Sequence, residues 1–360
     1  MVGTGAHLGD LAFGTAFKLA VFKDGEVDAA DPQVGEVNAD TLRYRRGIDG
    51  VGQVPGLAAV DHANVFGRVE VTTGGTVRAI GDDAAAFETS SGQLGLITTD
   101  MLVENNHFRC DWGTPAQIGI KSVVCNVSDI AAMGGTPAFM FVSLVLPADS
   151  DVAWVEKLYR GMADACRRYG VVLAGGDTTH GKAITISITL LGWVSPDNLC
   201  LRSQARPGDL LCVTGPLGGS AAGLAMQRAG LNPPPYLQNK LLTPDCRLDV
   251  SPAIAPWAHA MIDISDGLAA EVNHICDQSG TGAEIVAADI PIHPSVVAAA
   301  GLTDKDVLEF ALAGGEDFEL LFSISRKNKQ RLEDQGIEVT DLAGEPAEAL
   351  DVRDRYDVSS

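Results

Sequence analysis

Short apolar runs, typical of β-strands, alternate with longer amphipathic runs, typical of helices, over most of the sequence. Strand-like runs begin near Val69 and recur at 94–98, at 139–146, on either side of 175–177, and at 210–214, 283–286 and 318–324. Helix-like runs follow Thr114, span 152–169, and begin near Ser220 and Ser265. Because strands and helices interleave in both halves, the sequence predicts a mixed α/β fold.

A hydrophilic bend at residues 203–209, which contains Pro207 and Gly208, separates the two halves of this pattern. We therefore expect an N-terminal segment at 1–65, a first domain at 66–205 and a second domain at 206–360. A chain of 360 residues is long enough for two domains to bury a core each.

The chain is strongly acidic, with 47 Asp and Glu residues against 26 Lys and Arg residues and a net charge of -21. This balance argues against nucleic acid or an anionic membrane as partner, since those surfaces select cations. Solubility and clustered metal ligands both remain as explanations. The seven cysteines contain no CxxC pair, no uncharged apolar run is long enough to span a bilayer, and no export signal is evident, so we expect reduced thiols and a cytoplasmic location.

The placement of the acidic residues is more informative than their number. They fall at expected strand ends, in turns, or on an otherwise apolar helix: Asp82, Asp83, Asp100, Asp129, Asp177, Asp263, Asp266, Glu316 and Asp317. The Asp129 helix is expected to have Thr114 as its N-cap, Pro115 as its first residue and Gly134 at its end. Ser122, Asn126 and Asp129 then share one face of it, within about 60°.

Carboxylates that gather repel one another unless a cation neutralises them, and oxygen ligands without clustered His or Cys select magnesium, calcium or manganese. Magnesium is the first choice, and phosphoryl or nucleotide chemistry is implied, since metal ions join carboxylates to phosphates. Any one Asp taken alone is explained as well by a turn or a cap. In residues 263–267, capping accounts for Ser265 but leaves Asp263 unexplained.

Three further features each allow two interpretations. The Gly-rich turn at 213–220 lacks the Lys of a P-loop, so it is either a tight turn or a cradle of N–H groups for phosphate. Lys121 is either a solvated side chain or a phosphate contact. His107, which lies just beyond Asp100, is either structural or a contact to a phosphorylated substrate.

Eight motifs, in this order, resemble those of the thiamine-monophosphate kinases. They are GDDAA (81–85), TTDMLVE-x-x-HF (98–108), K-x-x-x-x-NVSDIAAMGGTP (121–137), GGDTT (175–179), RPGD (206–209), TGPLGGSAAGL (214–224), DISDGL (263–268) and GGEDFELLF (314–322). The same superfamily contains aminoimidazole ribonucleotide synthetase, selenophosphate synthetase and a carbamoyl-dehydrating hydrogenase-maturation protein. The resemblance spans roughly residues 75–325.

The resemblance implies a two-domain, synthetase-like protomer that forms a homodimer through a barrel of N-terminal sheets. It implies direct transfer of the ATP γ-phosphoryl group to thiamine monophosphate, with Mg2+ and no phosphoenzyme. By matching positions, the magnesium ligands are Asp83, Thr99, Asp100, Asp129, Asp177, Asp263 and Asp266, of which Asp129 and Asp100 are the catalytic pair. Nucleotide contacts are Tyr159, Gly176, Asp177, Arg202 and Ser265, and substrate contacts are His107, Glu316 and, at the C-terminus, Tyr356.

The chain departs from the family at several positions. Eighty residues precede the GDD motif, where the family has about thirty, and Asn105 stands where the family has Gly. Asn tolerates the left-handed backbone, so this turn is expected to keep its shape.

Two alternatives remain: another ATP-dependent synthetase of the superfamily, or a non-catalytic dimer that binds nucleotide or metal. Selenophosphate synthetase expects an N-terminal Cys, whereas the first here is Cys110, and the dehydratase expects a C-terminal Cys, which this chain lacks. The intact Asp100, Asp129, Asp177 and Asp263 disfavour the non-catalytic dimer.

Overall fold

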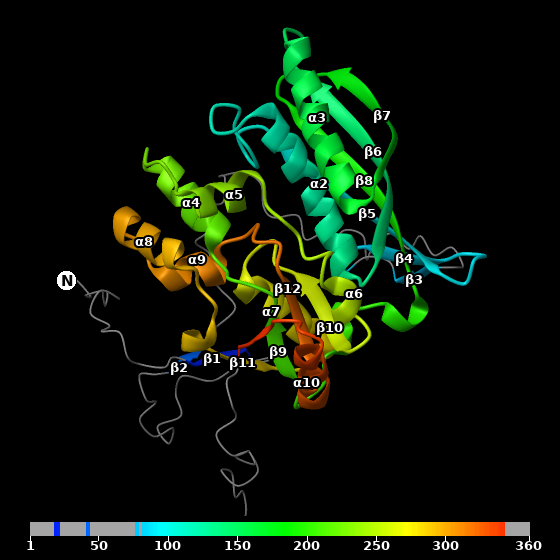
Figure 1. Ribbon diagram of the computed structural model, residues 1–360, viewed down its shortest axis with the longest axis vertical. Helices are drawn as coiled ribbons and strands as arrows, with labels where there is room; N and C mark the ends of the chain where they lie inside the picture. Colours follow the sequence, from blue (N-terminus) through cyan, green and yellow to red (C-terminus); the bar gives the residue numbers. More distant parts are fainter. Residues whose placement is uncertain (1–17, 22–40, 44–75, 79–80, 343–360) are drawn as a thin grey trace, which may run out of the picture.

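The computed structural model describes residues 18–21, 41–43, 76–78 and 81–342 (Figure 1). Its first domain contains a six-stranded sheet. In spatial order the strands are Thr76–Arg78 (β3), Ala85–Glu88 (β4), Leu94–Val103 (β5), Thr185–Val194 (β8), Thr136–Leu146 (β6) and Val172–His180 (β7). Within this sheet, only β6 and β7 pair in parallel. The mixed α/β architecture is confirmed.

Two helices cover one face of this sheet, Pro115–Ala132 (α2) and Val152–Tyr169 (α3) (Figure 1). The Thr114 cap of α2 is confirmed. The Thr114 hydroxyl accepts the backbone N–H of Gln117, and the Gln117 side-chain oxygen accepts the backbone N–H of Thr114. Helix α3 ends at Gly170, which has the left-handed φ of 71° that favours glycine.

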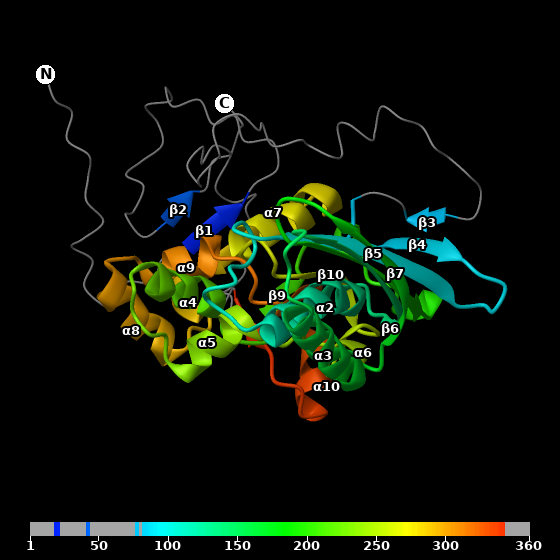
Figure 2. The same ribbon diagram turned by 90° about the horizontal axis from the view of Figure 1, so that it is seen from above.

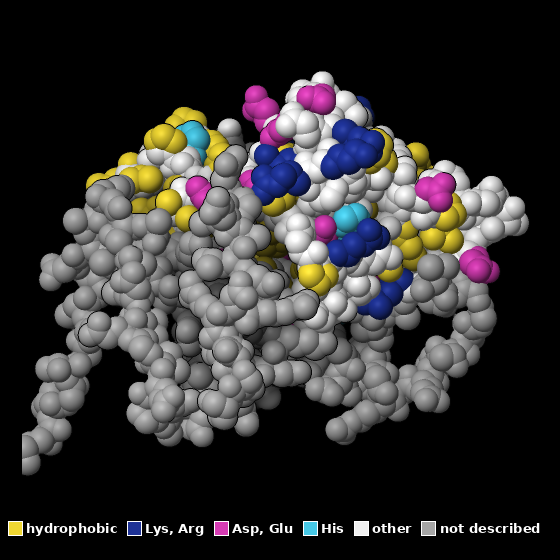
Figure 3. All heavy atoms as spheres, turned by 90° about the horizontal axis from the view of Figure 1, so that it is seen from below, with side chains coloured by type: hydrophobic (Ala, Val, Ile, Leu, Met, Phe, Trp, Pro, Cys, Tyr) yellow, Lys and Arg dark blue, Asp and Glu magenta, His cyan; other side chains and the backbone are white. Residues whose placement is uncertain are grey.

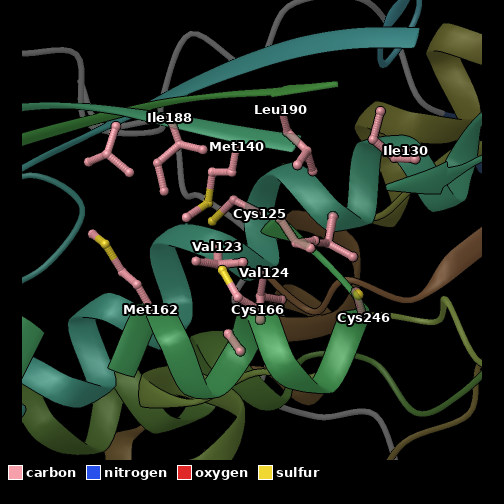
Figure 4. Close-up of a cluster of buried hydrophobic side chains, with 14 of the residues drawn as sticks. Val123, Val124, Cys125, Ile130, Met140, Met162, Cys166, Ile188, Leu190 and Cys246 are labelled. Carbon is pink, nitrogen blue, oxygen red and sulfur yellow. The ribbon is translucent and has the colours of Figure 1, made fainter. Parts of the chain in front are cut away.

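The core of the first domain lies between these helices and the sheet. Figure 4 shows α2 side chains packed toward sheet residues such as Met140 and Ile188 and toward Met162 of α3. The helices approach closely because Gly161 faces the Ala116 carbonyl, where a Cβ would lie 1.9 Å from the oxygen. This close crossing fixes α2, and therefore Asp129, relative to the sheet.

The other face of the same sheet carries exposed apolar side chains. Ile97, Met101, Phe139, Phe141 and Leu173 are 37–55% exposed. Large apolar side chains that gather on one exposed sheet face are typical of an interaction surface.

The second domain is built on a four-stranded sheet of Ala258–Asp263 (β10), Leu320–Ile324 (β12), Leu210–Val213 (β9) and Thr340–Asp341 (β13). Helix Leu268–Ser279 (α7) packs on one face of it, and Ser251–Ile254 (α6) and Arg326–Asp334 (α10) pack on the other. Figure 3, the view from below, shows Lys and Arg side chains in small groups at this end, where α10 lies.

Four further helices form a separate apolar cluster around Phe310: Gly219–Arg228 (α4), Pro235–Leu242 (α5), Pro294–Thr303 (α8) and Val307–Ala313 (α9). They lie at the opposite end of the molecule from β3 and β4 (Figure 2). A small three-stranded sheet contains, in spatial order, Ala283–Val286 (β11), Lys18–Val21 (β1) and Thr41–Arg43 (β2). Short 3-10 turns occur at Pro196–Asn198 (η2), Arg202–Gln204 (η3) and Ala287–Asp289 (η4). Most of the N-terminal segment predicted at 1–65 lies outside the described residues.

Three local predictions were wrong. Strand β5 does not end at Asp100 but continues to Val103, because it pairs with β8 along its whole length. Gly175–Asp177 does not separate two strands but lies inside β7, at a register shift against β6. Ser265 does not cap a helix, since α7 starts after Gly267 without a side-chain cap.

Candidate active site

Three carboxylates from three distant segments meet where the two domains join. Asp83 precedes β4, Asp129 lies on α2 and Asp263 ends β10, and one carboxylate oxygen of each lies within 4.8 Å of the others. The sequence predicted each of the three as a metal ligand. Oxygen-only ligands at this spacing suit a hard divalent cation.

Hydroxyl groups and one guanidinium hold these carboxylates in place. Thr98 on β5 donates to Asp129 at 2.5 Å, and Ser128 donates to Asp263 at 2.6 Å. The Arg202 guanidinium donates to Asp83 at 2.5 Å. Each ligand is therefore oriented by a partner from another part of the chain, as second-sphere groups orient ligands in metal sites.

The cluster is electrostatically strained without a cation. Burial raises the pKa of Asp129 well above the usual carboxyl value, and the charges of Asp263, Asp100 and Asp83 raise it further. Burial and the charge of Asp83 likewise raise the pKa of Asp263. Burial raises the pKa of Asp83 to about 6 although Arg202 opposes the shift. One oxygen of Asp83 is buried without a hydrogen-bond partner. A bound divalent cation would satisfy these groups.

Asp100 joins the same region from the middle of β5. Its backbone N–H donates to the Asn126 side chain at 3.2 Å, which ties the strand to the polar face of α2. Burial raises the pKa of Asp100; His107 lowers it and Asp266 raises it. Asp100 therefore lies within electrostatic reach of both the cavity and the second domain.

The loop between β10 and α7 supplies Ser265 and Asp266. The buried Glu271 of α7 accepts the N–H of Asp266 at 3.0 Å and the hydroxyl of Ser265 at 3.4 Å. Burial raises the pKa of Glu271 to about 7. This carboxylate holds the loop beside the cluster.

Arg202 belongs to a second charged group that supports the cluster. Asp82 has a fully buried side chain, accepts the backbone N–H of Arg202 at 2.8 Å and lies 2.5 Å from the Arg78 guanidinium. Burial opposes the charged form of Arg202, but the charge of Asp83 and the hydrogen bond to it raise the pKa of the guanidinium above its usual value. A partly buried cation is thus held on the Asp83 side of the cluster.

A cavity of about 810 Å³ opens between the domains. His107 and Glu316, both predicted as substrate contacts, line it together with Lys121. The Lys121 ammonium donates to Glu316 at 2.8 Å and to the His107 carbonyl at 3.2 Å. Lys121 is therefore not a solvated side chain. Phe108, Trp112 and Phe310 give the same cavity an aromatic wall.

Left-handed backbone positions shape the rim of this cavity. Glu316 has φ 63° and its N–H donates to the Ser265 carbonyl at 2.8 Å, which joins the cavity to the β10–α7 loop. Asn105 has φ 65°, which confirms that Asn keeps the left-handed turn expected of it. Strain of this kind concentrates at functional sites.

Several predicted residues do not reach the cluster within one chain. Thr99 faces the opposite side of β5 and donates to the Ile188 carbonyl at 3.0 Å, whereas Thr98, which the sequence reading missed, contacts Asp129. Asp177 lies on β7, opposite Ser143 of β6. The same row continues across β8 to Met101 of β5, so three strand spacings, or about 14 Å, separate Asp177 from β5.

Gly176 and Tyr159 have other surroundings too. A Cβ at Gly176 would lie 1.9 Å from the Val142 carbonyl, so close strand approach explains the glycine. Tyr159 lies near the start of α2, because the carbonyl of the preceding residue, Leu158, packs against Gly119. Gly119 is about 15 Å from Asp129 along the axis of α2. Tyr356 lies outside the described residues.

The Gly-rich turn at 213–220 is a tight turn whose donors are occupied. Asp317 accepts the N–H of Gly218 at 2.6 Å and of Ser220 at 3.3 Å. Gly218 has φ 79°, which explains the glycine. The backbone N–H groups of Gly218 and Ser220 are therefore not free to bind a phosphate.

The residues that the sequence reading missed are Thr98, Ser128, Glu271 and Trp112. Ser128 directly precedes Asp129, and Thr98 lies two residues before Asp100, so hydroxyls beside expected ligands were a usable signal. Glu271 and Trp112 had no such signal, because only tertiary packing brings them to the site.

The fold and the divided carboxylate site define an AIR synthase-related protein. The family model for the AIR synthase related protein N-terminal domain matches residues 81–194, and that for the C-terminal domain matches residues 206–356. Within this class, the chain belongs to the thiamine-monophosphate kinases, and it is an enzyme of that kind.

Named relatives carry this assignment. The thiamine-monophosphate kinase of Bacillus subtilis (strain 168) is 35% identical over 264 residues, which are 71% of this chain and 80% of that protein. That of Escherichia coli (strain K12) is 37% identical over 276 residues, which are 75% of this chain and 83% of that protein. A solved structure described as AaThiL complexed with AMPPCP and TMP has a TM-score of 0.68 and 34% identity, covering 73% of this chain and 84% of that one. The solved structure of thiamine monophosphate kinase from Aquifex aeolicus has a TM-score of 0.66 and 33% identity, covering 73% of this chain and 88% of that one. In the described part of this chain, no helix is long and apolar enough to cross a bilayer.

Proposed function

We infer that this enzyme transfers the γ-phosphoryl group of ATP directly to thiamine monophosphate, giving thiamine diphosphate, with several Mg2+ ions. The observation that carries this inference is the convergence of Asp83, Asp129 and Asp263 beside a cavity that holds His107 and Glu316. The solved relative described with an ATP analogue and TMP supports the same pair of substrates.

The carboxylates fit magnesium by their chemistry and their surroundings. Asp83, Asp129 and Asp263, joined by Asp100 and Asp266, offer only oxygen ligands, and burial has raised the pKa of the first three. Bound magnesium supplies charge neutralisation of the transferring phosphoryl group. Asp129 and Asp100, one from a helix and one from a strand, are the pair that we assign to catalysis.

The protein's own groups have mainly to position and neutralise. Because the acceptor oxygen belongs to a phosphate that is largely ionised near neutral pH, no side chain has to remove a proton from it. Arg202 and Ser265 lie on the side of Asp83 and Asp266 and contact the nucleotide, while His107 and Glu316 contact the acceptor in the cavity. Direct transfer in line then needs no phosphoenzyme.

The remaining assignments require a second copy of the chain. Asp177, Gly176 and Tyr159 lie too far from Asp129 within one protomer to contact the same nucleotide. The exposed apolar face of the six-stranded sheet supports a homodimer that brings these residues to the partner's site. We assign the enzyme to the cytoplasm, as its biosynthetic relatives and reduced thiols suggest.

The test is a direct assay. Purified protein with ATP, Mg2+ and thiamine monophosphate should form thiamine diphosphate and ADP in equal amounts, with no radioactive label left on protein from γ-labelled ATP. Absence of product from a preparation that binds an ATP analogue would remove the substrate assignment. Labelled protein would remove the direct transfer.

A further inference from the structure

Lys121 is a buried cation placed at the edge of the 810 Å³ cavity. Its side chain is only 6% exposed, whereas that of its partner Glu316 is 33% exposed. An ammonium group has three donors. Among the described residues, it donates to the His107 carbonyl and to Glu316, which leaves one donor for a ligand.

The position of Lys121 on α2 connects the cavity to the carboxylate cluster. Lys121, Cys125 and Asp129 are spaced by four residues, so they follow one face of the helix. Eight residues span about 12 Å along the axis. Burial raises the pKa of the Cys125 thiol, as do the charges of Asp100 and Glu316, while Lys121 lowers it. Cys125 thus lies among the charges of both ends.

A phosphate monoester in this cavity needs a cation on its own side. The clustered carboxylates repel it, and the partly buried Arg202 is engaged on the far side with Asp83. Three other Lys and Arg side chains line the cavity: Arg109, Arg228 and Lys305. Arg228 is exposed. Arg109 and Lys305 are 45% and 47% exposed and are paired with Asp111 and Glu309 on their own segments. Exposed pairs of this kind contribute little. Lys121 is the buried cation that remains.

Resting on the proposed function, we propose that Lys121 binds the phosphate of the acceptor, so that it distinguishes thiamine monophosphate from unphosphorylated thiamine. The phosphate competes with Glu316 for the ammonium group and comes to lie between Lys121 and the carboxylate end of α2. His107 and Glu316 are then left to contact the remainder of the acceptor. Charge-assisted hydrogen bonds to phosphate are strong enough for this discrimination.

The test compares two ligands that differ only in the phosphate. Binding of thiamine monophosphate and of thiamine is measured calorimetrically, with Mg2+ and a non-hydrolysable ATP analogue, for the wild type, Lys121→Met and Lys121→Arg. In Lys121→Met the preference for the monophosphate should fall at least about tenfold through weaker monophosphate binding alone. Lys121→Arg should keep part of the preference, since it keeps the charge.

Lys305→Met is the matched control, because it removes a cation of the same cavity that is exposed; its preference should equal that of the wild type. If Lys121→Met does not fold, the double variant Lys121→Met/Glu316→Leu replaces it, since removing both partners of a buried pair is tolerated better than removing one. It too should lose the preference.

Equal weakening of both ligands, or an unchanged preference, in the Lys121 variants would overturn the role of Lys121. A wild type that binds ATP analogue but neither thiamine nor thiamine monophosphate would instead overturn the proposed function, so the two failures are distinguishable. The KM for ATP should stay within about threefold in Lys121→Met, since the nucleotide contacts lie at the other end of α2.

Discussion

At the scale of single residues, Asp129 is under two opposed demands. Its carboxylate is buried against Asp263 and Asp83, which raises its pKa, yet the proposed metal site needs it ionised. Thr98 donates to it and would donate equally well to an amide oxygen. A ligand that is costly for the metal-free fold is expected where function selects it.

Asp129→Asn should therefore abolish turnover while stabilising the metal-free protein. We expect kcat to fall at least about 100-fold, since a ligand is lost. In EDTA the thermal midpoint should rise, because a buried charge repelled by two neighbours has been removed. Calorimetry with and without Mg2+, beside a kinetic assay, measures both. Undiminished activity would exclude Asp129 from catalysis.

Trp112 is the residue whose role the structure adds to the acceptor site. It lines the cavity beside Phe108, and the Arg109 guanidinium lies 4.8 Å from its ring centroid. An aromatic wall suits a flat heterocyclic substrate. Trp112→Ala should raise the KM for thiamine monophosphate about tenfold and leave the KM for ATP unchanged, whereas Trp112→Phe should keep most of the affinity. Equal effects on both substrates would count against a substrate contact.

At the scale of elements, the α2–α3 crossing is the feature that holds Asp129 against the sheet. A Cβ on Gly161 would lie 1.9 Å from the Ala116 carbonyl oxygen, which belongs to the backbone and cannot move aside cheaply. Gly170, by contrast, has no atom within 4 Å of its Cβ position, although its φ is 71°.

Gly161→Ala should therefore destabilise the protein by about 2–3 kcal/mol through overpacking, and Gly170→Ala by only about 1 kcal/mol through its backbone conformation. Urea unfolding of the two variants measures the difference. Gly161→Ala should also lower activity, since it shifts α2. If both variants lose equal stability, the close crossing does not limit the packing of these helices.

The same elements show what a sequence can specify about a fold. The bounds of α2 and α3 were predictable because their caps, Thr114 and Gly170, act locally. The extent of β5 past Asp100 was not, because it depends on pairing with β8, some ninety residues away. The site divides in the same way: Asp83, Asp129 and Asp263 stand out by their neighbours in sequence, whereas Glu271 and Trp112 are identified only by packing.

At the scale of the whole molecule, buried carboxylates make stability depend on pH. Burial raises the pKa of Asp83 and of Asp317 to about 6, and that of Glu271 to about 7, against ordinary values of 3.8 and 4.5. Between these limits the folded protein holds protons that the unfolded chain has released. Stability from these groups is therefore fully present below pH 4 and is lost as the pH rises through 6 to 7.

In EDTA the thermal midpoint should thus fall by roughly 3 °C or more between pH 5 and pH 7.5. Mg2+ should raise the midpoint more at pH 7.5 than at pH 5, because it binds the ionised carboxylates. Glu271→Gln should flatten the EDTA profile. A midpoint in EDTA that climbs steadily to pH 7.5 would contradict the assignment.

The proposed dimer makes the sharpest statement about the whole assembly, because it divides one active site between two chains. Asp129 belongs to the cluster of its own protomer, whereas Asp177 lies on the edge strand β7, three strands away from β5. If Asp177 serves the partner's site, an Asp129→Asn chain and an Asp177→Asn chain are each inactive alone. A hybrid dimer of the two then has one site with both substitutions and one site with neither.

Equal amounts of the two inactive variants, unfolded together and refolded, should consequently regain about a quarter of the wild-type activity, since half of the dimers are hybrids and each hybrid has one intact site. Each variant refolded alone is the control and should stay inactive. If both residues served the same chain, no combination would restore an intact site, and the mixture would remain as inactive as its components.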